Sequence, residues 1–171
     1  GKIRQMLLSE TNLKSMKNTV QPAISNQYKS LDQAEAAATA IVQTLYESGR
    51  FPIQAGELSI VFVDDPVIAD IHGRYLNDPT ATDVITFPAD SEMASAGEII
   101  ISVDHARTRA KDLHLPVSHE LSLYLAHGWL HLAGYDDRNE SDREKMRAAE
   151  AAAIHVLAAE GALDGFRMRE T

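Results

Sequence analysis

The sequence predicts an α/β (α+β) fold, in which a small mixed sheet of about four strands is surrounded by about five helices. Three observations predict it. Short runs rich in β-branched residues lie near the centre of the chain. Alanine-rich or amphipathic segments lie between and after them. Capping residues mark where many of these segments begin and end. A chain of 171 residues suits one domain.

The first part of the chain predicts an extension, an edge strand and a helix. Residues 1–19 are polar and aperiodic, so we expect a flexible N-terminal extension followed by one domain over residues 20–171. Val20 to Tyr28 favours a short edge strand, although Pro22 weakens it. Ser30, Asp32 and Glu35 signal the start of an alanine-rich helix, which spans Gln33 to Ser48 and ends at Gly49.

The central part predicts three strands and a short helix. Leu58 to Val63 alternates and is rich in β-branched residues, which is typical of a strand. Asp64-Asp65-Pro66 opens a helix to about Tyr75, and a turn follows at residues 77–80. Asp83 to Phe87 and Glu98 to Val103 are the other two strands, joined by a polar loop over residues 89–97.

The last part predicts three helices. Asp104 is expected to cap a helix that runs to about His114. Ser118 begins the next helix, which reaches about Leu132 and ends at Gly134. The final helix spans about Glu140 to Ala159. Its cap is Asn139 or Ser141, and Gly161 ends it.

Composition excludes several classes of protein. The chain has no cysteine, which excludes disulfides, thiolate metal sites and a cysteine nucleophile, so any metal must be held by imidazole and oxygen. The net charge is -9, so contact with RNA would need a local basic patch. Residues 1–30 carry a net of +4, which we interpret as a solvated tail or, alternatively, an RNA-contacting arm. Because no apolar run approaches the ~20 residues that span a bilayer, we expect a cytoplasmic protein with no membrane partner.

The segment from His127 to Asp137 predicts a metal cleft on the His-x-x-x-His helix. His127 and His131 lie four residues apart, so a helix places both imidazoles on one face. Gly134 can end this helix with a positive φ, and the returning chain places Asp137 ten residues after the first histidine. This spacing resembles that of metzincins and predicts a metal-dependent hydrolase. Imidazole and carboxylate ligands favour zinc or a similar first-row ion.

Two features qualify this site. Asp136 competes with Asp137 for the third ligand position, or could orient a ligand imidazole from behind. Zinc proteases carry a glutamate directly after the first histidine as general base, whereas this chain has Gly128. Proteolysis is therefore disfavoured, and a metal-bound water must supply the nucleophile.

The segment from His127 to Asp136 resembles the YbeY family of bacterial endoribonucleases, whose signature reads His-Gly-x-Leu-His-Leu-x-Gly-Tyr-Asp-His. Two further stretches match in order, Thr-Asp-Val-Ile-Thr-Phe-Pro at residues 82–88 and Gly-Glu-Ile-Ile-Ile-Ser at residues 97–102. Met146 and Glu150 downstream are also in place. The resemblance covers roughly Ile24 to Leu157.

The resemblance implies a mixed sheet of about four strands around a metal cleft. It also implies zinc-dependent cleavage of single-stranded RNA in ribosomal RNA processing, small-subunit maturation and ribosome quality control. The implied partners are ribosomal RNA and the small ribosomal subunit or its proteins, with no DNA expected. The chain departs from the family in two places. Asp137 stands at the third ligand, which is histidine in the family, and Leu76 stands where the family carries an arginine.

Several other residues are candidates for the site. Arg74, two residues from the missing arginine, could reach the cleft from another angle or be a solvated helix residue. Thr82, Thr86 and Ser102 could bind phosphate, Tyr135 could stack on a base or pack in the core, and Glu120 could be a partner of a ligand or line a channel. Trp129 is expected in the core. Two alternatives to a ribonuclease remain: a ribosome-assembly binding factor with a mainly structural metal, and a metal-dependent hydrolase of another substrate, such as a peptide.

Overall fold

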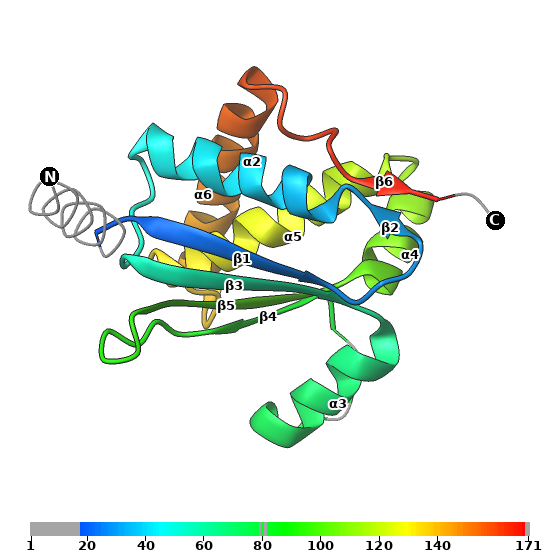
Figure 1. The fold of residues 1–171 in the computed structure, drawn as a ribbon, viewed down its shortest axis with the longest axis horizontal. Coiled ribbons are helices and arrows are strands. Elements are labelled where there is room, and N and C mark those ends of the chain that lie inside the picture. Colours follow the sequence, from blue (N-terminus) through cyan, green and yellow to red (C-terminus); the bar gives the residue numbers. More distant parts are fainter. Residues whose placement is uncertain (1–17, 79, 81, 170–171) are drawn as a thin grey trace, which may run out of the picture.

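A computed structural model describes residues 18–78, 80 and 82–169, and its centre is a four-stranded sheet (Figure 1). The strands lie in the order β1-β3-β5-β4, and their bounds are β1 Val20–Asn26, β3 Gly56–Val63, β5 Ser95–Ser102 and β4 Val84–Phe87. Strands β1, β3 and β5 are parallel, and β4 pairs with β5 antiparallel. The predicted mixed sheet of four strands is confirmed. Pro22 lies on β1 at the edge of the sheet, where a missing N–H is tolerated.

In the part of the chain that the structure describes, five helices surround this sheet, as predicted: α2 Ala34–Ser48, α3 Asp65–Leu76, α4 Val103–Leu113, α5 Val117–Leu132 and α6 Glu140–Ala159. Helices α2, α5 and α6 lie on one side of the sheet, and α3 lies on the other (Figure 1). None of the helices in the described part of the chain is long and apolar enough to span a bilayer.

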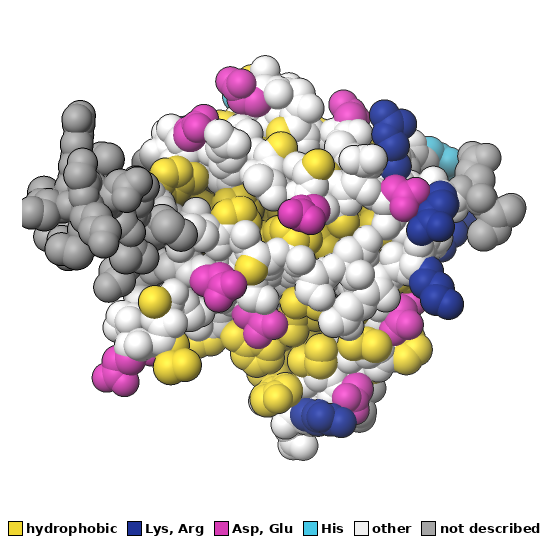
Figure 2. Space-filling view, viewed as in Figure 1, with side chains coloured by type: hydrophobic (Ala, Val, Ile, Leu, Met, Phe, Trp, Pro, Cys, Tyr) yellow, Lys and Arg dark blue, Asp and Glu magenta, His cyan; other side chains and the backbone are white. Residues whose placement is uncertain are grey.

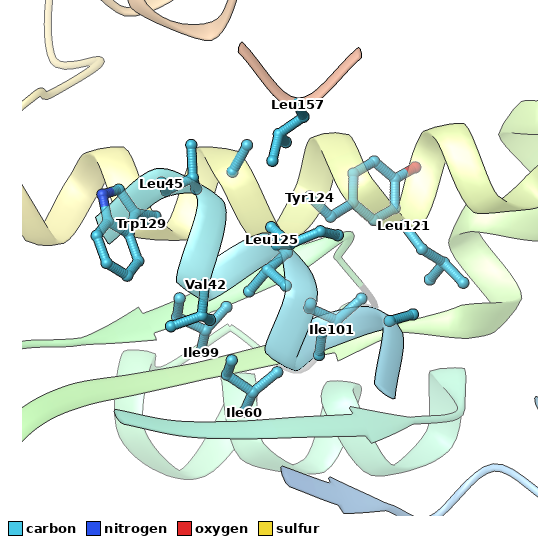
Figure 3. Packing of buried hydrophobic residues seen from close by; sticks show 14 of the residues in the cluster. Val42, Leu45, Ile60, Ile99, Ile101, Leu121, Tyr124, Leu125, Trp129 and Leu157 are labelled. Atoms are coloured by element: carbon cyan, nitrogen blue, oxygen red, sulfur yellow. The ribbon is translucent and has the colours of Figure 1, made fainter. Parts of the chain in front are cut away.

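The main core lies between the sheet and helices α2, α5 and α6. Side chains alternate along a strand, so Leu58, Ile60 and Phe62 of β3 point to this side and are fully buried. Figure 3 shows Ile60, Ile99 and Ile101 of the sheet packed under Val42 of α2 and Leu125 of α5. A smaller cluster of Val63, Ile68, Ile85 and Ile100 lies on the other side, under α3. Helix α5 is thus held in place by the sheet below it and by its neighbouring helices.

Some predicted boundaries are wrong. Ser102, not Asp104, caps α4, because its hydroxyl accepts the N–H of His105 while Asp104 accepts bonds from the Tyr28 hydroxyl and the Asp65 N–H. The loop predicted over residues 89–97 is shorter, since β5 already begins at Ser95. Helix α5 begins one residue earlier than expected, at Val117, directly after Pro116.

The structure also contains a second, two-stranded sheet that the sequence pattern did not predict. Strand β2 (Leu31–Asp32) pairs antiparallel with β6 (Arg167–Met168), which brings the end of the chain against the loop before α2. Two-residue strands show no periodicity, so the pattern of the sequence could not reveal them. Of the predicted extension, residues 1–17 lie outside the described residues.

Candidate metal centre

His127 and His131 lie on the last two turns of α5, where one helical turn separates them. Their Nε2 atoms are 3.0 Å apart, and the ring centroids are 4.6 Å apart with the planes nearly perpendicular. Gly128 allows this helix to lie directly on β5, because a Cβ at this position would come within 2.7 Å of the Ile99 side chain. The sheet therefore fixes the position from which both imidazoles project.

The chain then returns a carboxylate to the two imidazoles. Gly134 adopts φ +102, a conformation that other residues resist, directly after the Ala133 cap of α5. Asp137 follows, and its Oδ2 lies 3.7 Å from Nε2 of His131. One ligand atom from each of the three residues lies within 4.8 Å of the others.

This donor set fits a first-row metal ion. Bonds of about 2.0–2.2 Å to nitrogen and oxygen in a tetrahedral site place neighbouring donors about 3.4 Å apart, and the distances of 3.0 and 3.7 Å lie on either side of that value. His127, His131 and Asp137 could therefore hold one ion together. Three protein ligands leave a fourth position open, as in catalytic rather than structural sites.

Asp136, the alternative candidate for the third ligand, makes contacts within its own loop. Its Oδ2 lies 2.6 Å from Nε of Arg138, and its Oδ1 accepts the backbone N–H of Asp137 at 2.8 Å. Both oxygens are thus used within the loop, and Asp137 is the carboxylate that joins the histidines. The bond from Asp136 to its neighbour's backbone also shapes the turn that presents Asp137.

Glu150 of α6 stands behind the first histidine. Its Oε2 lies 3.6 Å from Nδ1 of His127, on the side of the ring away from His131. Burial alone would lower the pKa of His127, but the Glu150 carboxylate and the nearby Asp83 and Asp137 raise it above its ordinary value. Burial and the neighbouring His127 lower the pKa of His131. A carboxylate at Nδ1 favours the tautomer whose Nε2 lone pair is free for a metal.

Replacing Glu150 with Gln is expected to weaken metal binding by roughly 10–100-fold, the usual effect of losing a partner of a ligand histidine. The amide keeps the size of the side chain but lacks the charge that orients the ring. Competition with a chromophoric chelator would measure the affinity. Glu144→Gln on the exposed part of α6 is the control. Equal affinities of the two variants would contradict a role for Glu150.

A groove of about 430 Å³ opens beside the second histidine. Its lining includes Thr86 of β4, His131 of α5, and Tyr135, Asp136 and Arg138 of the loop that follows. Arg138 is the cation of this groove, and its side chain is 83% exposed. Tyr135 lines the groove and also packs its ring edge-on against Phe51.

Other predicted site residues lie elsewhere or are used within the fold. Arg74 is on α3, on the other side of the sheet from α5, and pairs with Asp70 at 3.1 Å (Figure 1). Ser102 is fully buried, and its hydroxyl donates to Asp65. Thr82 is half-buried beside the carboxylate of Asp83.

Glu120 lies on α5 one turn before Tyr124 and is buried. Burial and the nearby carboxylate of Glu120 raise the pKa of Tyr124. Asp83 contributes to the electrostatic surroundings of both Tyr124 and His127. Of these groups, Glu120 and Tyr124 are buried, whereas Asp83 and His127 are partly buried.

Sequence reasoning missed Arg138 and the contact that Glu150 makes. Glu150 lies on the next helix, so no local spacing links it to His127. Arg138 adjoins the metal segment, but an arginine after two aspartates reads as an ordinary solvated loop residue. Only the turn at Gly134 brings it beside His131.

The fold and site define a class of protein: an α/β domain whose helix-borne histidine pair and returning carboxylate could hold a metal ion. Comparison with known proteins gives the family. Residues 22–158 match the family Endoribonuclease YbeY. The chain belongs to the YbeY endoribonuclease family.

Individual relatives agree with this assignment. Endoribonuclease YbeY of Methylocella silvestris is 35% identical over 129 residues, which cover 74% of this chain and 73% of the relative. That of Chlamydia caviae is 34% identical, with 86% of this chain and 97% of the relative covered. A solution structure from Thermotoga maritima shares the fold with a TM-score of 0.61 at 19% identity, covering 86% of this chain and 95% of that one.

Proposed function

We propose that this protein is a zinc-dependent endoribonuclease that cleaves single-stranded RNA in ribosomal RNA processing, small-subunit maturation and ribosome quality control. One observation carries the proposal. In a chain of the endoribonuclease family, His127, His131 and Asp137 converge to within 4.8 Å, with an open groove beside them. Nitrogen and oxygen donors with one position free suit a catalytic zinc ion.

In the proposed reaction, the metal ion and the residues around it have different roles. A bound ion supplies Lewis-acid chemistry, activating water and polarising a phosphoryl oxygen. Asp137 contributes a negative charge at the position where the family signature that this chain resembles has histidine, so the site offers less positive charge to a phosphate. Arg138 lines the same groove as His131, and its exposed guanidinium, which pairs with Asp136, faces the phosphate as well and offsets charge that develops on it. Thr86 offers a hydroxyl on the same groove.

Replacing Arg138 with Ala is expected to lower RNA cleavage by about 10-fold, because charge-assisted contacts with phosphate are stronger than neutral ones. Arg138→Lys should keep part of the rate. The zinc affinity should stay unchanged, since Arg138 is not a ligand. Arg143→Ala, an exposed arginine paired with Glu140 on α6, is the control. Initial rates on a fluorescent oligonucleotide would measure the effect, and a full rate in Arg138→Ala would exclude this role.

A second function is favoured by a specific observation. Leu76 is 51% exposed where the family has arginine, and Arg74 pairs with Asp70 on the far side of the sheet. A protein that had lost a catalytic arginine could still act as a ribosome-assembly factor with a mainly structural metal. It would bind RNA or a ribosomal protein and would not cut RNA.

The decisive experiment is cleavage of single-stranded RNA under control of the metal. The purified protein should cut RNA, lose activity on chelation and regain it with added zinc. Asp137→Ala should lose activity as well, because two histidines hold the ion weakly. Cleavage that survives both chelation and Asp137→Ala would refute the proposal. RNA that is bound but never cut would favour the assembly factor.

A further inference from the structure

Basic side chains gather at one end of the molecule, around β2, β6 and the exposed side of α4. Figure 2 shows several lysine and arginine side chains together at the end where β6 lies in Figure 1, with acidic side chains beside them and others scattered over the rest of this face. We call this the cationic end; its basic residues are Lys29, Arg107, Lys111, Arg167 and Arg169, all of them exposed.

Three segments distant in sequence place these residues together. Strand β6 pairs Asp32 with Arg167, and the backbone N–H of Arg169 donates to the Ser30 carbonyl at 2.7 Å. The Arg169 guanidinium also donates to the Lys29 carbonyl. On α4, Arg107 donates to the Tyr28 hydroxyl at 3.0 Å. Lys111 follows Arg107 one helical turn later, on the same face of α4.

The charges at this end are poorly neutralised. Elsewhere, Arg74, Arg138, Arg143 and Arg147 each pair with an acidic side chain. At the cationic end, Arg169 alone forms an ion pair within the described residues, with Asp32.

The acidic groups here do little to offset the excess. The Asp104 carboxylate accepts bonds from the Tyr28 hydroxyl and the Asp65 N–H. When every charged residue of segments 28–32, 103–113 and 167–169 is counted, Arg109 and Asp112 included, six basic and three acidic side chains give a net of +3, in a chain whose net charge is -9. Such a local excess attracts polyanions in spite of the overall charge.

We propose that the cationic end binds the sugar–phosphate backbone of single-stranded RNA, away from the bond that is cut. This inference rests on the proposed function, which supplies the RNA. Helix α4 ends at Leu113, next to the start of α5, while His127 and His131 lie in the second half of α5. Sixteen residues of helix span about 24 Å, so one strand of several nucleotides can reach both places. Tyr28 adds an aromatic ring among the cations.

The test removes three charges whose loss should leave the fold intact. Lys29, Lys111 and Arg167 make no side-chain hydrogen bond or ion pair within residues 18–78, 80 and 82–169. The variant Lys29→Ala, Lys111→Ala, Arg167→Ala is titrated with fluorescent oligouridine of about 20 nucleotides, in chelator so that no cleavage occurs. Its affinity should fall at least 10-fold. The slope of log affinity against log salt should shrink by about 2, since each lost phosphate contact removes about 0.7 for a single strand.

A matched variant removes the same charge elsewhere. Arg143→Ala, Lys145→Ala, Arg147→Ala takes three basic residues from α6 and should leave the slope unchanged. Equal losses in the two variants would mean that only net charge matters and would overturn the proposal. Binding of polyglutamate as tight as that of oligouridine, with the same loss in the first variant, would overturn it too, in favour of an acidic protein partner. If the wild type binds through this end but never cuts, the proposed function fails and this inference stands.

Discussion

Replacing His131 with Ala is expected to lower zinc affinity by on the order of 1,000-fold and RNA cleavage by a similar factor. His131 is the central member of the group, because its Nε2 lies 3.0 Å from that of His127 and 3.7 Å from the Asp137 carboxylate. Without His131, only the His127 imidazole and the Asp137 carboxylate remain as ligands, and the donor that lies close to both of them is lost. The loss should exceed the roughly 10–100-fold that removal of a partner behind a ligand causes. Chelator competition and initial rates on single-stranded RNA would measure both quantities.

Thermal unfolding gives a readout of this variant that is independent of activity. Zinc at about 100 times its dissociation constant stabilises a folded protein by about 2.7 kcal/mol, so zinc should raise the Tm of the wild type and not that of His131→Ala. His155→Ala, on the exposed side of α6, is the control and should respond as the wild type does. A zinc-induced rise in Tm that persists in His131→Ala would place the metal elsewhere.

Replacing Trp129 with Ala is expected to destabilise the fold by about 3–5 kcal/mol, the usual range for a buried tryptophan. Trp129 is 1% exposed and lies beside Leu45 of α2 in the core (Figure 3). Its Nε1 donates to the Phe51 carbonyl at 2.8 Å, across 78 residues of sequence. For a domain of this size the Tm should fall by roughly 6–20 °C. Urea and thermal unfolding followed by circular dichroism would measure it.

The variant Trp129→Phe distinguishes the contribution of the buried aromatic ring from that of the hydrogen bond to Phe51. Phenylalanine keeps much of the apolar contact but leaves the Phe51 carbonyl without its donor, which should cost about 1–3 kcal/mol. Val67→Ala, at a partly exposed position of α3, should cost less than either. If Trp129→Ala unfolds at the same urea concentration as the wild type, this packing of α5 against α2 is wrong.

The sequence predicted the fold, and it singled out the three residues that the structure brings together as a possible metal site, because both depend on local spacing. Alternation revealed Leu58–Val63 as a strand with one face in the core, and the histidine pair is visible at a separation of one helical turn. The family resemblance placed these elements around a metal cleft, and the matching family confirms that resemblance.

Features that depend on contacts between distant segments could not be predicted. Glu150 reaches His127 only because α6 packs against α5, and β2 meets β6 across more than 130 residues. Ser102 is a local feature whose contacts the sequence did not indicate. A serine at the end of a strand near the site suggested a phosphate ligand, but this hydroxyl is used to cap α4 and to bind Asp65.

The close packing of Gly128 on Ile99 restricts how this site can evolve. A Cβ at residue 128 would lie 2.7 Å from the branched side chain of a fully buried isoleucine, so even alanine requires the Ile99 side chain, or α5 and β5 themselves, to shift. The glutamate that zinc proteases use in this place is therefore not one substitution away. A new catalytic group could instead arise by substitution of exposed residues that line the groove, such as Arg138, because these positions can change without moving the sheet.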